Sequence, residues 1–140
     1  MSHFTSAKAI LLDAAGNILV LRRSSTHPLY AYHLDLPGGL VDEGEDPSDA
    51  VAREVFEETG LIIDASTLRL GHEDIRPVTN CHYQTYIGRL PEKEPDVAIS
   101  WEHDQHRWLT PREFVNDELP DGVDPHYRMA VEFLAAYDRV

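Results

Sequence analysis

The chain has 140 residues, of which 42% are hydrophobic and 26% charged, so its composition is that of a globular domain and neither disorder nor a fibrous repeat is indicated. Twelve Lys and Arg against 25 Asp and Glu give a net charge of −13, which disfavours nucleic-acid binding because that function normally demands a basic patch. This charge also repels a small phosphorylated substrate unless a bound cation inverts the local field, so it permits a metal-dependent phosphate enzyme.

The first elements predicted along the chain are a hairpin and a short extended segment. Two apolar stretches, residues 7–13 and 17–21, flank Ala14, Ala15 and Gly16, which is the pattern of two strands joined by a short turn. Residues 33–36 follow as an extended segment, and we expect Pro37, Gly38 and Gly39 to end it with a tight turn.

A helix is predicted next, from Pro47 to Thr59. Asp46 can accept hydrogen bonds from the first free amides of this helix, and proline suits its first position. Gly60 supplies the left-handed residue that commonly follows the end of a helix.

Three strands and a short helix are predicted in the second half of the chain. Residues 68–75, 83–90 and 106–109 have the composition of strands. Thr110 and Glu113 have the spacing of a capping box, with a proline at the first helical position, so a short helix should follow.

The last predicted element is a helix that begins after Asp124, again with a proline at its first position. It has one apolar face, formed by Ala130, Phe133, Leu134 and Tyr137. The order of elements predicts an α/β or α+β sandwich that forms a single domain over residues 1–140.

Several features predict a cytoplasmic location. No apolar run approaches the ~20 residues that span a bilayer, and residues 1–8 lack the apolar core of a signal peptide. The single cysteine, Cys81, cannot form an internal disulfide and suits a reducing compartment.

Three glutamates of the helix at 47–59 indicate a metal site. Glu54, Glu57 and Glu58 are three and four residues apart, so their carboxylates share one helix face. Carboxylate oxygens suit a hard cation such as Mg²⁺, which activates water and neutralises phosphoryl charge. Arg53 stands four residues before Glu57 and can pair with it. The alternative for such a cluster on its own is a solvated acidic face.

The 23 residues from Gly39 to Leu61 resemble the Nudix box, GX5EX7REUXEEXGU, without a departure. Chance agreement at seven fixed positions has a probability of about one in 10⁷ or less, which outweighs the alternative of an acidic face. The fixed residues are Gly39, Glu45, Arg53, Glu54, Glu57, Glu58 and Gly60, with aliphatic Val55 and Leu61.

This resemblance implies an α/β/α sandwich with a mixed sheet, the box helix and a C-terminal helix. It implies an enzyme that hydrolyses a nucleoside diphosphate linked to another moiety, with Mg²⁺ or Mn²⁺ as cofactor. Glu54, Glu57 and Glu58 are then the metal ligands, and Glu57 or Glu58 deprotonates water. The catalytic set further includes Arg53, which with Glu45 is expected to support the loop and helix.

Further site residues are predicted outside the box. Many Nudix relatives supply another acidic residue after the box; Glu102 matches best and Asp104 second, and the alternative is an ordinary exposed acid. Arg22 and Arg23 suit bidentate phosphate binding, or else are exposed charges at a strand end.

Gly38 and Gly39 are predicted to let the backbone approach the substrate closely. Tyr30, Tyr32 and Tyr83 are candidates for base stacking, although aromatic side chains more often serve packing.

The predicted partner is therefore a small nucleotide such as a modified nucleoside triphosphate, ADP-ribose or a nucleotide sugar. Neither nucleic acid nor membrane is expected as a partner, and a homodimer is the default expectation for a soluble oligomer. The alternative functions are a nucleotide-binding sensor that has the Nudix fold without turnover, and a plain acidic interaction domain.

Overall fold

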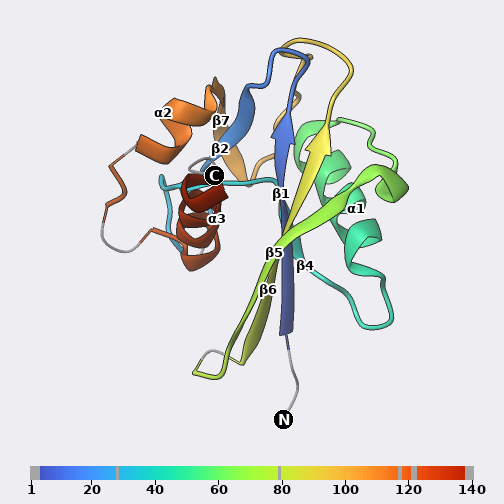
Figure 1. Cartoon of the computed structure of the whole chain (residues 1–140), viewed down its shortest axis with the longest axis vertical. Helices are drawn as coiled ribbons and strands as arrows, with labels where there is room; N and C mark the ends of the chain where they lie inside the picture. Colours follow the sequence, from blue (N-terminus) through green and yellow to red (C-terminus); the bar gives the residue numbers. More distant parts are fainter. Residues whose placement is uncertain (1–3, 28, 79, 117, 121–122, 138–140) are drawn as a thin grey trace.

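The computed structural model describes residues 4–27, 29–78, 80–116, 118–120 and 123–137. In Figure 1, helix α1 (Pro47–Thr59) lies on one side of the sheet, and α2 (Pro111–Asn116) and α3 (Pro125–Tyr137) lie on the other. This arrangement confirms the predicted α/β/α sandwich, with the box helix and the C-terminal helix as its outer layers.

The described residues form one mixed sheet, with the strand order β3-β2-β1-β6-β5; in addition β4 pairs with β1 and β7 with β2. A short 3-10 helix at Ala65–Thr67 precedes β5. The strands are β1 (Phe4–Leu12), β2 (Ile18–Arg23), β3 (Leu34–Asp35), β4 (Gly38–Leu40), β5 (Arg69–Arg76), β6 (Cys81–Arg89) and β7 (His103–Leu109).

The predicted N-terminal hairpin forms, but its two strands diverge directly after the turn. They share the pair Leu12↔Ile18, and beyond it each strand has other partners. β1 runs parallel to β6 along its length and pairs with β4 at residues 6–8, whereas β2 pairs with β7 and β3. The two diverging strands are therefore connected through consecutive short strands, because β3 pairs with β2 and β4 pairs with β1.

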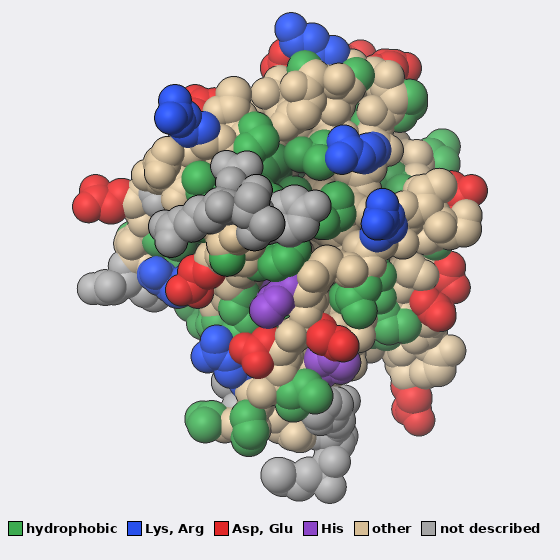
Figure 2. Space-filling view, in the orientation of Figure 1, with side chains coloured by type: hydrophobic (Ala, Val, Ile, Leu, Met, Phe, Trp, Pro, Cys, Tyr) green, Lys and Arg blue, Asp and Glu red, His purple; other side chains and the backbone are tan. Residues whose placement is uncertain are grey.

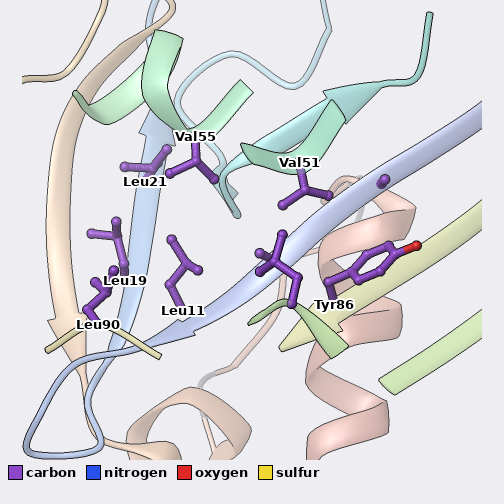
Figure 3. Packing of buried hydrophobic residues seen from close by; sticks show 10 residues of the cluster. Leu11, Leu19, Leu21, Val51, Val55, Tyr86 and Leu90 are labelled. Carbon is purple, nitrogen blue, oxygen red and sulfur yellow. The ribbon is translucent and has the colours of Figure 1, made fainter. Parts of the chain in front are cut away.

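The core has two layers because successive side chains of a strand point to opposite faces of the sheet. Leu11 of β1 packs on the side of α1 with Val51 and Val55, as Figure 3 shows. Ile10, the preceding residue, packs on the side of α3 with Tyr127. The box helix and the C-terminal helix are thus both seated on the sheet by buried apolar side chains.

Local capping signals set the helix ends as predicted. The Asp46 side chain accepts a hydrogen bond from Ser48 N at 3.0 Å, and Gly60 follows α1 with a φ of +76°. At α3, Asp124 Oδ1 accepts from the backbone nitrogen of His126 at 2.8 Å. These contacts satisfy amides that have no partner inside the helix.

The prediction of a tight turn at Gly38 and Gly39 was wrong, because these residues form strand β4 against β1. A Cβ on Gly38 would lie 2.4 Å from the carbonyl oxygen of Ala7. Glycine is required there because two backbones approach closely, with a φ of +131°. β7 also begins earlier than predicted, at His103, because pairing with β2 holds this polar segment in the sheet.

The described part of the chain contains no helix long and apolar enough to cross a membrane.

Candidate active site

Helix α1 carries the three predicted carboxylates in three different environments. Glu58 is buried, with 4% of its surface exposed, and Glu57 has 53% of its side chain exposed. Glu54 lies between these extremes, with 17% of its side chain exposed. One face of the helix therefore carries an exposed carboxylate, Glu57, a largely covered one, Glu54, and a buried one, Glu58.

Glu58 is held by a backbone amide of β4. Gly38 N donates a hydrogen bond to Glu58 Oε1 at 2.8 Å. Burial raises the pKa of Glu58 well above its ordinary value, and the Gly38 hydrogen bond and nearby Lys8 offset only part of this effect. A carboxyl group of this kind is stabilised as an anion when a cation binds beside it.

Glu54 lies against Gly39, the first residue of the box. A Cβ at Gly39 would lie 3.1 Å from the carboxyl carbon of Glu54, so the missing side chain leaves room for the carboxylate. Burial raises the pKa of Glu54, and the negative charges of Glu57 and Glu102 add to this effect, although Arg53 opposes it. Glu102 therefore lies near the box carboxylates.

Arg53 ties the loop before α1 to the helix. Its guanidinium donates Nε to Glu45 Oε2 at 2.9 Å and Nη2 to Glu45 Oε1 at 3.0 Å, a bidentate pair. Its Nη1 lies 3.2 Å from Glu54 and 3.3 Å from Glu57, so the predicted pairing with Glu57 forms. The hydrogen bonds to Glu45 raise the pKa of Arg53, and Glu45 is held as an anion with a lowered pKa.

The segment before β7 is fastened to the end of α1. Ser100 N donates to the carbonyl oxygen of Glu58 at 3.2 Å, and the carbonyl of Glu102 accepts from Ser24 N at 2.9 Å.

Asp104, the second candidate for the additional acidic residue, instead forms a bidentate pair with Arg22, both contacts at 2.8 Å.

The two arginines at the end of β2 have different surroundings. Arg22 is partly exposed beside Asp104. Arg23 is buried: Nε contacts Asp35 at 3.0 Å, Nη2 contacts Asp124 at 2.8 Å and Nη1 donates to the Leu29 carbonyl at 3.0 Å. Their phosphate-binding role stays a prediction.

Comparison with known proteins identifies the family of this chain. The sequence model of the NUDIX domain family matches residues 2–133. This chain is a Nudix protein. The prediction of a Nudix-type pyrophosphohydrolase is thereby confirmed at the level of the family.

Individual Nudix relatives agree with this assignment. The chain is 50% identical over 60 residues to an RNA pyrophosphohydrolase of Acidiphilium cryptum, a match that covers 43% of this chain and 37% of the relative. It is 26% identical to a MutT-like protein of Streptomyces ambofaciens, over 90% of this chain and 82% of the relative. The crystal structure of a MutT protein from Methanosarcina mazei superposes with a TM-score of 0.75 at 27% identity, covering 98% and 94% of the two chains.

The Nudix carboxylates fit a divalent metal by their chemistry. In the described residues, no three acidic, histidine or cysteine side chains already converge as a ligand set. The raised pKa of Glu54 and that of Glu58 nevertheless reflect burial and repulsion from neighbouring carboxylates, which a hard cation relieves. The room left at Gly39 lies directly against one of these carboxylates.

A buried ionic network beside the Nudix site was missed by the sequence analysis. Asp35 of β3 contacts Lys8 of β1, Arg23 of β2 and His103 of β7. Burial would raise the pKa of Asp35, but Lys8, the His103 hydrogen bond and Arg23 together lower it. One signal was available: the lysine at position 8 lies between two alanines and directly before an apolar run.

Proposed function

We propose that this Nudix protein hydrolyses a diphosphate linkage in a nucleoside diphosphate derivative, in a metal-dependent reaction. The observation that carries the proposal is the buried Glu58 carboxylate, held by Gly38 N at 2.8 Å and accompanied on the same helix by Glu54 and Glu57. Such a group would be unfavourable as a purely structural feature, because a buried carboxylate needs compensation.

Mg²⁺, or Mn²⁺ in its place, would be held by Glu54, Glu57 and Glu58, with Glu102 as an additional ligand. Bound there, the metal would supply charge neutralisation at the phosphates and acidify a water molecule. Water attacks one phosphorus, the bridging P–O bond breaks, and Glu57 or Glu58 accepts the proton from the attacking water.

The other residues of the box position these carboxylates. Arg53 holds Glu45, Glu54 and Glu57 at once, so it fixes the side-chain directions on the helix face. Arg22 and Arg23 are the proposed phosphate ligands, together with the backbone at Gly38 and Gly39. Arg22 is the partly exposed one of the two, whereas Arg23 would have to give up a contact to Asp35, Asp124 or the Leu29 carbonyl.

The substrate class follows from charge. A net charge of −13 disfavours a long polyanion as substrate. On the face of the molecule that Figure 2 shows, the Lys and Arg side chains are scattered and do not form one basic patch. We therefore propose a small nucleotide, such as a modified nucleoside triphosphate, ADP-ribose or a nucleotide sugar, in a cytoplasmic enzyme. The relative named as an RNA pyrophosphohydrolase makes a 5′-triphosphorylated RNA the competing substrate to test.

The test is product analysis by mass spectrometry. 8-Oxo-dGTP, ADP-ribose, a nucleotide sugar, a dinucleoside polyphosphate and 5′-triphosphorylated RNA are each incubated with and without Mg²⁺. We expect metal-dependent cleavage between phosphates of one class of small nucleotide, and a loss of at least a hundredfold in Glu58→Gln. Glu132→Gln, which changes an exposed glutamate of α3, is the matched control.

Two outcomes would contradict the proposal. Cleavage that persists in excess chelator would exclude a role for the metal. Nucleotide binding without any product would favour the sensor alternative.

A further inference from the structure

Trp101 presents a large aromatic ring to solvent from a backbone that is tightly held. The residue is 74% exposed. Its carbonyl oxygen accepts hydrogen bonds from Ser24 Oγ at 2.8 Å and from Thr26 Oγ1 at 3.4 Å. The backbone of Trp101 is therefore anchored to the loop after β2, while its ring is exposed to solvent.

The neighbours of Trp101 place it at the rim of the Nudix site. The preceding residue, Ser100, donates its backbone N–H to the carbonyl oxygen of Glu58 at 3.2 Å. The following residue, Glu102, is held by the loop after β2, because its carbonyl oxygen accepts a hydrogen bond from Ser24 N at 2.9 Å. Since consecutive Cα atoms are about 3.8 Å apart, the indole projects from a residue next to one that is hydrogen-bonded to the end of α1.

The other aromatic candidates for base stacking already have partners on their rings. The guanidinium of Arg23 lies 5.3 Å from the Tyr30 ring centroid, and that of Arg22 lies 5.4 Å from the Tyr32 centroid. The Tyr83 ring packs against His126 at 5.3 Å.

Trp101 differs from these three tyrosines. Over the residues that the structure describes, no aromatic or cationic side chain stacks on its indole.

We propose that the indole of Trp101 is a stacking platform for the base of the nucleoside diphosphate derivative. This inference rests on the proposed function and adds a binding determinant to it. Stacking on an aromatic face tolerates every base, because each base has a π-face. The platform thus favours substrates that carry a base over diphosphates that lack one, without selecting among bases.

Binding is tested first, independently of turnover. In Trp108→Phe, which replaces the second tryptophan of the chain by another aromatic residue, Trp101 is the only tryptophan fluorophore. With Mg²⁺ present, α,β-methylene-ADP should quench this fluorescence saturably, whereas methylenediphosphonate, which has no base, should not. Equal responses to both probes would overturn the inference, as would nucleotide binding detected by calorimetry without quenching.

Steady-state kinetics give the second test. We expect Trp101→Ala to raise KM for a base-bearing substrate by roughly 5- to 100-fold, the effect of losing one base–aromatic stack, with kcat little changed. Trp101→Phe should recover most of the loss. Val78→Ala, which trims a side chain that is 99% exposed after β5, is the matched control and should behave like wild type.

An unchanged KM in Trp101→Ala, with metal-dependent cleavage intact, would refute the stacking platform and leave the proposed function standing. If no substrate is cleaved, the proposed function fails while the quenching experiment still decides whether Trp101 binds a base.

Discussion

Acidification from pH 7 to pH 5 should destabilise the folded protein through His126, a histidine buried in α3. The side chain is 1% exposed, with Nδ1 2.9 Å from Ser6 Oγ and Nε2 3.3 Å from Thr85 Oγ1. Burial lowers the pKa of His126 from 6.5 to about 3, and the positive charge of Lys8 adds to this effect. The carboxylates of Asp124 and Asp35 oppose it only in part.

The sign and size of this pH effect on the free energy of unfolding follow from proton linkage. Between pH 6.5 and pH 3 the unfolded chain binds a proton at this residue and the folded chain does not, so stability falls as pH falls. With a pKa of 6.5 unfolded and about 3 folded, the loss between pH 7 and pH 5 is about 2 kcal/mol. The stabilisation is complete above pH 6.5 and is lost progressively toward pH 3.

Urea unfolding at pH 7, 6 and 5 measures this loss in the wild type and in His126→Gln. Gln lacks the titration, so the variant should lose about 2 kcal/mol less than the wild type over this interval, whatever its stability at pH 7. His106→Gln, at an exposed position of β7, is the control and should retain the wild-type slope. Equal slopes for the wild type and His126→Gln would refute the reasoning.

Three further substitutions test how the site is held together. Gly39→Ala should reduce kcat at least tenfold with little change in melting temperature, because its Cβ would lie 3.1 Å from the Glu54 carboxyl carbon. Gly38→Ala should destabilise the fold by about 3 kcal/mol or more in urea unfolding, since strain adds to a backbone clash at 2.4 Å. Asp35→Asn should cost roughly 3–5 kcal/mol in the same assay, because it leaves buried cations without a full counter-charge.

Elements with local signals were predictable from the sequence. The bounds of α1 follow from Asp46, Pro47 and Gly60, each of which acts within one turn of the helix. The Thr110–Glu113 capping box also forms as predicted, with reciprocal hydrogen bonds of 2.8 and 3.1 Å. In these cases the residue and the backbone group that it satisfies are close in the sequence.

Contacts between distant segments were not predictable in the same way. Lys8, Arg23, Asp35 and Asp124 meet in one network although they come from β1, β2, β3 and the start of α3. No spacing rule connects these positions, because their contacts depend on how β1 and β2 diverge. The interpretation of Gly38 as a turn residue failed for the same reason: its need for glycine comes from the approach of β1.

The geometry of the box carboxylates therefore depends on residues outside the Nudix box. The box supplies Glu58, but the amide that holds this carboxylate belongs to Gly38, which precedes the box and pairs with Lys8. Lys8 in turn binds Asp35, three residues before Gly38, so a buried ion pair joins β1 to β3, the strand that precedes β4 in the chain. A complete box is thus insufficient by itself, because the position of Glu58 is fixed by the strand pairing and the ionic network together.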